Sequence, residues 1–255
     1  MVALGLLLSA DNGVRSAAEA ELERLKLENP ALVAVTLVDT LTQPADADEA
    51  ERSIAVVLAR RVIPVILPRL PSDAVARVKA GLLQALSVDY SPAMRRKLCD
   101  TVGRLAAEFQ AHGMWPELNA FVEGACSGND PRAHESALAI LEHMAPALLS
   151  TWSACGAAVL AMCASGLGSA EESVRSTGLS TLTALLRTCA DLEAMASNSS
   201  ERKAYKAIAA QLGGALPRCV DVLEALVGRG DGSATRTQAA LKPRLHCRFI
   251  GVTSP

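Results

Sequence analysis

The side chains best suited to metal binding or catalysis are scattered along this 255-residue chain. Its seven cysteines form no C-x-x-C pair and no Cys/His cluster with zinc-like spacing. His134 and His143 are nine residues apart, so one helix does not present both imidazoles on the same face. The sequence GLGS at 166–169 lacks the strand that must precede a nucleotide-binding loop. We therefore expect no metal, no cofactor and no enzymatic activity.

The cysteines have a simpler interpretation. Their number is odd, and they fall on apolar stretches with helical periodicity. We expect reduced, buried thiols, as in proteins of the cytosol or nucleus.

The basic residues, in contrast, are regularly spaced. Five arginines each stand early in a stretch with helical periodicity: Arg15, Arg52, Arg95, Arg132 and Arg175. The distances from each of these five to the next are 37, 43, 37 and 43 residues. The mean period is therefore about 40 residues, with two helical segments in each period, and this length lies in the range of known helical repeats.

The clearest helix lies at 91–111. Ser91 can cap it, and Pro92 is tolerated at its first position because the missing N–H is not needed there. Apolar residues then follow at steps of 4, 4, 3 and 4, which gives one buried face. This face consists of Met94, Leu98, Val102, Leu105 and Phe109. The same steps recur two periods later, from Val174 to Cys189.

A fixed period with paired helices is typical of HEAT and armadillo solenoids, in which each pair buries its apolar face against its neighbours. The composition agrees, since half of the residues are hydrophobic but only 3% are aromatic. We predict an all-α, α-α superhelix of about five and a half helix pairs over residues 1–228. We expect Pro64–Pro71 to be a loop.

The periodic pattern ends after Gly228. Pro243 interrupts the next segment, and the remaining residues have neither an apolar face nor a cap. We interpret 229–255 as a flexible or aberrant tail, and the chain as a fragment or altered product of a longer solenoid.

Charge and hydropathy exclude other classes of partner. A net charge of −2 gives no general affinity for nucleic acid. The apolar start, Met1–Ala10, lacks the basic residues of a signal peptide. The uncharged stretch Met144–Ala170 has the length of a membrane span but is interrupted by Pro146 and several serines. We expect no membrane insertion.

Several motifs together resemble the importin-beta (karyopherin-beta) family, and most closely its importin-five and importin-four branch. The resemblance rests on DNGVR at 11–15, ERSIAVVLARR at 51–61, MRRKLCD at 94–100 and WPEL at 115–118. It covers residues 1–190 well and 200–228 weakly.

This resemblance implies a nuclear transport receptor that shuttles between cytoplasm and nucleus. It implies Ran in its GTP form, phenylalanine-glycine proteins of the nuclear pore, and protein cargo as partners. The second helix of each pair lines the concave face in this family. On these helices the residues expected to contact Ran are Arg60, Arg61, Arg95, Arg96 and Lys97.

Structural roles compete with these functional ones. The five regularly spaced arginines could pair with carboxylates of the neighbouring repeat, and the remaining cations could simply be solvated. Trp115 could anchor packing or line a pocket. The rival function is a HEAT-repeat scaffold or adaptor that is unrelated to Ran.

Overall fold

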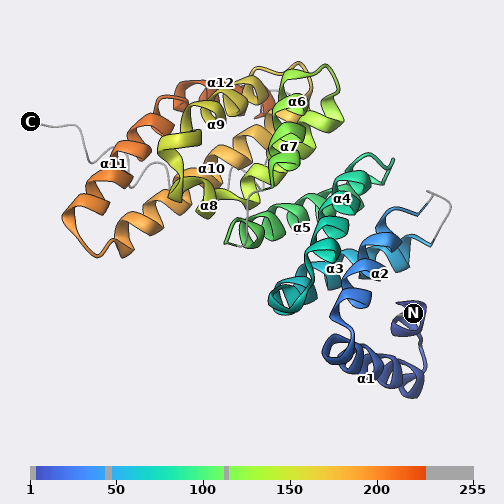
Figure 1. Cartoon of the computed structure of the whole chain (residues 1–255). Coiled ribbons are helices and arrows are strands. Elements are labelled where there is room, and N and C mark those ends of the chain that lie inside the picture. Colours follow the sequence, from blue (N-terminus) through green and yellow to red (C-terminus); the bar gives the residue numbers. More distant parts are fainter. Residues whose placement is uncertain (1–3, 44–47, 112–114, 228–255) are drawn as a thin grey trace, which may run out of the picture.

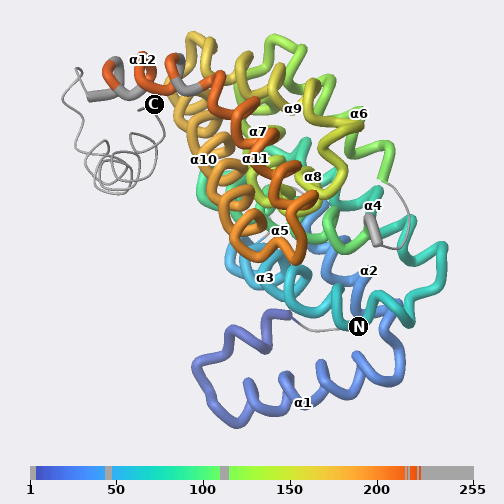
Figure 2. The backbone as a smooth tube through the Cα atoms, turned by 90° about the vertical axis from the view of Figure 1, so that its left-hand side faces the viewer, coloured from blue at the N-terminus to red at the C-terminus, as the bar shows by residue number. Residues whose placement is uncertain are grey.

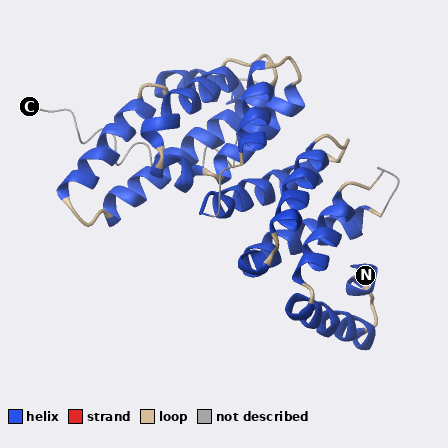
Figure 3. Ribbon diagram, in the orientation of Figure 1, coloured by secondary structure: helices blue, strands red, loops and turns tan. Residues whose placement is uncertain are grey.

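The computed structural model describes residues 4–43, 48–111 and 115–227, and this part of the chain is helical without strands (Figure 1 and Figure 3). Within these ranges, short 3₁₀ helices form at η1 (Leu4–Leu8) and η2 (Leu67–Arg69). The α-helices are α1 (Asn12–Glu28), α2 (Pro30–Leu41), α3 (Glu49–Ile66), α4 (Ser72–Leu86), α5 (Pro92–Ala111), α6 (Pro116–Ser127), α7 (Pro131–His143), α8 (Ala145–Ser150), α9 (Trp152–Leu167), α10 (Glu172–Met195), α11 (Ser199–Gly213) and α12 (Leu216–Val227).

The helices form two layers that follow the length of the molecule (Figure 2). Helices α3, α5, α7 and α10 pack side by side in one layer, which we call the second-helix layer. In the other layer α2 packs on α4, and α6 packs on α9. The two layers are joined because each of these four helices also packs on the next helix of the chain. The predicted α-α superhelix is therefore confirmed.

Helix α5 shows how the sequence produces this arrangement. The Ser91 hydroxyl accepts a hydrogen bond from the Met94 N–H at 3.3 Å, as expected of a cap. The predicted apolar face is buried along its whole length, from Met94 to Phe109. At the start of α7, Asp130 likewise accepts from the Arg132 N–H at 2.9 Å. Local caps thus begin the helices, and the apolar faces join them into layers.

The expected loop at Pro64–Pro71 is wrong in part. Helix α3 continues through Pro64 to Ile66, and η2 follows directly. Pro64 lies in the last turn of α3. Because proline has no backbone N–H, one helical hydrogen bond is lost there, close to the point where the helix ends. Ile63 and Ile66 are both buried, so packing maintains this turn.

The uncharged stretch at 144–170 is divided at Thr151 into α8 and α9. Both helices pack against α10. Within the described ranges, no helix combines the length and the hydropathy needed to cross a membrane.

The last repeat departs from the simple pattern. Helix α10 extends to Met195, and α11 packs along it rather than along α9. Helix α12 contacts both α9 and α10. The Trp152 indole N–H donates to the Gln211 side-chain oxygen at 2.8 Å and so connects α9 to α11.

The thiols match the sequence expectation. All six cysteines in the described part are free, and all except the half-buried Cys155 are buried. Burial raises the pKa of Cys99 and Cys126 to about 11 and that of Cys163 to about 12. These thiols are therefore protonated at neutral pH and poorly nucleophilic.

The proposed boundary after residue 228, and the tail at 229–255, lie outside the described residues.

Candidate partner-binding surface

The five cations predicted to contact a partner lie on α3 and α5, which are neighbours in the second-helix layer. Some of these cations lie close to an acidic or hydroxyl side chain of a neighbouring helix, and the others have no such partner among the described residues. The five cations therefore divide into paired and unpaired groups.

Three of them are paired across repeats. Arg60 on α3 forms an ion pair with Asp100 on α5. Arg95 faces Glu135 on α7 at 3.9 Å. The Lys97 ammonium donates to the Ser53 hydroxyl on α3 at 2.8 Å. These contacts join successive helices of the layer, so all three side chains have a structural role.

The other two cations are open to a partner. Arg61 and Arg96 are exposed, and no side chain in residues 4–43, 48–111 or 115–227 forms an ion pair or hydrogen bond with either. An unpaired guanidinium presents its five N–H donors in a rigid fork that matches a carboxylate or phosphate. Arg61 and Arg96 are therefore the best supported of the predicted contact residues.

The five regularly spaced arginines do not form one uniform ladder. Arg95 pairs with Glu135 of the following repeat. Arg132 pairs with Asp89 of the preceding repeat at 2.7 Å. Arg52 instead lies over the Tyr90 ring, 5.4 Å from its centroid.

Arg15 and Arg175 contact their own repeat. Each donates to the carbonyl oxygen six residues before it, of Ser9 at 3.0 Å and of Ser169 at 2.8 Å. The turn before each of these helices leaves a free carbonyl within reach, so the arginine stabilises the turn.

A threonine contact between repeats was not predicted from the sequence. The Thr101 hydroxyl lies 3.3 Å from the Val56 carbonyl oxygen, and the Thr181 hydroxyl lies 2.9 Å from the Leu138 carbonyl oxygen. Each hydroxyl also reaches the carbonyl four residues before it in its own helix, at 2.9 Å and 2.8 Å. The two threonines are two periods apart, the same shift that relates the two apolar stripes. A search for polar residues at this period would have found them.

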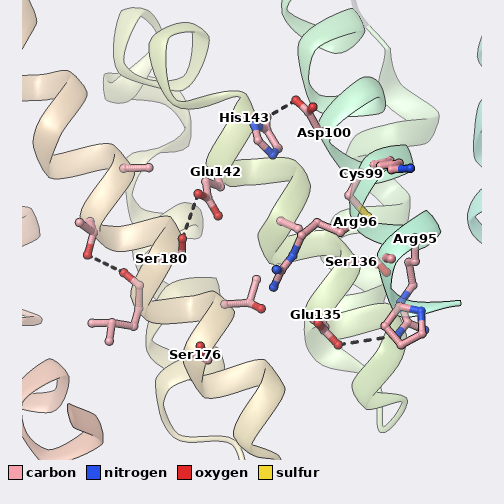
Figure 4. Close-up of a pocket in the computed structure, with 18 of the residues that line it drawn as sticks. Arg95, Arg96, Cys99, Asp100, Glu135, Ser136, Glu142, His143, Ser176 and Ser180 are labelled. Carbon is pink, nitrogen blue, oxygen red and sulfur yellow. Dashed lines mark hydrogen bonds and ion pairs between the residues drawn. The ribbon is translucent and has the colours of Figure 1, made fainter. Parts of the chain in front are cut away.

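A groove of about 880 Å³ lies over α5, α7 and α10 (Figure 4). Its lining includes Arg95 and Arg96 from α5, Glu135 and His143 from α7, and Arg187 from α10. Sequence reasoning missed the groove as a whole, because its three walls come from separate helical segments that only the packing of the layer brings together.

Asp100 connects three helices at one edge of this groove. Its carboxylate pairs with Arg60 on α3 and lies 3.4 Å from Nδ1 of His143 on α7. Three consecutive helices of the layer are thus tied together through one side chain.

Trp115 is a packing anchor. The side chain is 4% exposed, and its ring meets that of Phe109 edge to face, with centroids 5.4 Å apart. Lys79 lies over the Phe109 ring, 5.1 Å from its centroid.

In the described part of the chain, no three His, Cys, Asp or Glu side chains gather as metal ligands would. His134 is buried, and burial lowers its pKa. His143 faces Asp100 instead.

The comparisons with known proteins show a family through a family model and a fold through solved structures. Residues 90–238 match the family model described as "IPO5-like, TPR repeats". The structure is similar to that of the karyopherin Kap121p, with a TM-score of 0.69 and 20% sequence identity. It is also similar to Kap121p bound to RanGTP (TM-score 0.69, 20% identity) and to Kap121p bound to Nup53p (TM-score 0.70, 19% identity).

Each of these alignments covers 91% of this chain and 20% or 21% of the Kap121p chain. The chain therefore spans about a fifth of the length of the solved structures that it matches.

Proposed function

The chain belongs to the importin-5-like branch of the importin-beta family, and on this basis we propose that it is a segment of a nuclear transport receptor that binds Ran in its GTP form. The binding surface is the second-helix layer around α3 and α5. The segment acts by binding alone and catalyses no reaction.

One observation carries this proposal. Two of the predicted contact residues, Arg61 and Arg96, are exposed and unpaired within the described ranges, and they stand on adjacent helices of the layer. The cations around them are held in place by contacts between repeats, Arg60 by Asp100 and Arg95 by Glu135. A preorganised basic surface of this kind suits an acidic or phosphate-bearing partner. Kap121p, which has the same fold, has been solved in complex with RanGTP.

The remaining partners follow from the same family. We include among them phenylalanine-glycine proteins of the nuclear pore and protein cargo, with shuttling between cytoplasm and nucleus. Support comes from Kap121p structures bound to Nup53p, to Pho4p and to the SUMO protease Ulp1p.

The charge-reversal variant Arg61→Glu/Arg96→Glu tests the surface. Both side chains are exposed and unpaired within the described residues, so the fold should tolerate the change. We expect the Kd for Ran-GTP to rise about tenfold, because two attractive contacts become repulsive ones. Biolayer interferometry with immobilised Ran-GTP measures this change.

Lys203→Glu is the matched control. Lys203 is also exposed and unpaired within the described residues, but it lies on α11, away from α3 and α5. The control should bind Ran-GTP as the unmodified chain does. Equal binding by the double variant would remove Arg61 and Arg96 from the proposed contact.

A further inference from the structure

We propose that the groove over α5, α7 and α10 binds an extended, acidic segment of a polypeptide partner. The groove shares Arg96 with the proposed Ran surface, and it adds Arg187, Glu142 and the α10 serines, which that surface does not include. The inference rests on which of the charges in the groove already have partners.

Two carboxylates of the groove are satisfied by cations within the protein. Glu135 faces Arg95 at 3.9 Å, and Asp100 forms an ion pair with Arg60 and lies 3.4 Å from Nδ1 of His143. The two arginines leave little negative charge of these carboxylates open to a ligand.

The third carboxylate, Glu142, accepts a hydrogen bond from the Ser180 hydroxyl of α10 at 2.9 Å. In Figure 4 this contact runs between α7 and α10. Glu142 has no cationic partner in the described part, so it is the one acidic group here that would oppose an acidic ligand.

Two cations of the groove lining are open. Arg96 and Arg187 are exposed and, among the described residues, form no ion pair or hydrogen bond. Figure 4 shows Arg96 reaching from α5 across the groove toward α10, where Ser176 and Ser180 lie. The groove therefore offers guanidinium and hydroxyl donors to a ligand that carries carboxylates.

The length of the groove fits an extended chain. Its α10 wall runs from Ser176 to Arg187, which corresponds to about 16 Å along a helix axis at 1.5 Å per residue. An extended peptide covers about 3.3 Å per residue, so about five residues fill this distance. Acidic side chains along such a segment can pair with Arg96 and Arg187.

Fluorescence anisotropy tests the proposal with two rhodamine-labelled ten-residue peptides, one alternating Glu and Ser and the other alternating Lys and Ser. We expect the Glu peptide to bind and the Lys peptide to bind much more weakly. Arg96→Glu/Arg187→Glu should weaken binding of the Glu peptide about tenfold. Arg104→Glu is the matched control, because Arg104 is exposed on α5 but lies outside the groove lining.

A second variant changes affinity in the opposite direction. Glu142→Gln keeps an oxygen that can accept from Ser180 but removes the negative charge. We expect it to tighten binding of the Glu peptide about two- to threefold, a gain that misfolding would not produce. Preference for the Lys peptide, or Glu-peptide binding that neither variant changes, would overturn the proposal. These peptide measurements contain no Ran, so their outcome is independent of the Ran-binding test.

Discussion

Replacing Phe109 with alanine is expected to lower the free energy of unfolding by about 3–5 kcal/mol. Phe109 is 1% exposed and is among the largest fully buried side chains of the described core. Its ring contacts both the Trp115 ring and the Lys79 ammonium. Removing the ring leaves a cavity between α5 and the start of α6. Urea unfolding followed by circular dichroism measures the loss.

Phe121→Ala is the matched control, since it deletes the same ring from a half-buried position on α6. Less apolar surface is lost there, and the site opens to solvent, so we expect about half the effect or less. Equal losses in the two variants would contradict a larger packing contribution from the fully buried Phe109 ring.

Gly103→Ala is expected to destabilise the chain by about 1–3 kcal/mol through overpacking. A Cβ at this position would lie 2.7 Å from the Ile140 carbonyl oxygen and 2.7 Å from the His143 Cβ. The backbone of α7 cannot move without disturbing its own hydrogen bonds. Glycine thus permits the close approach of α5 and α7, and thermal unfolding of the variant should show a lower Tm.

A glycine-to-alanine substitution on α6 should have the opposite effect on the free energy of unfolding. A Cβ at Gly124 meets nothing within 4 Å among the described residues. Gly124→Ala should therefore raise the free energy of unfolding by about 0.5–1 kcal/mol, the usual gain for alanine over glycine in a helix. Stabilisation by both variants would mean that α5 and α7 are not in close contact at Gly103.

Periodicity predicted the repeating part of the fold. The apolar stripe from Met94 to Phe109 is buried as expected, and the predicted helix at 91–111 corresponds to α5. These features depend on local spacing and on caps such as Ser91, both of which can be recognised in one sequence.

Side-chain pairing between repeats could not be predicted in the same way. Arg95, Arg15 and Arg175 occupy similar sequence positions, but only Arg95 of these three faces the next repeat in the described structure. The difference depends on whether a carboxylate or a free carbonyl lies closer in three dimensions. For the same reason the sequence did not distinguish the unpaired Arg96 from its paired neighbours.

The length of α10 and the packing partner of α11 also could not be predicted from the sequence. Helix α10 continues beyond Cys189, the expected end of its apolar stripe, to Met195. Helix α11 packs along α10 instead of along α9. Helix propensity and periodicity predict that these helices form, but they do not predict which neighbouring helix each one packs against.

The most direct test of the proposed function is binding of the purified chain to Ran loaded with GTP and, separately, with GDP. The account predicts binding to the GTP form with a clear preference over the GDP form. Equal binding to the two forms, or binding to neither, would contradict it and would favour a HEAT-repeat scaffold unrelated to Ran.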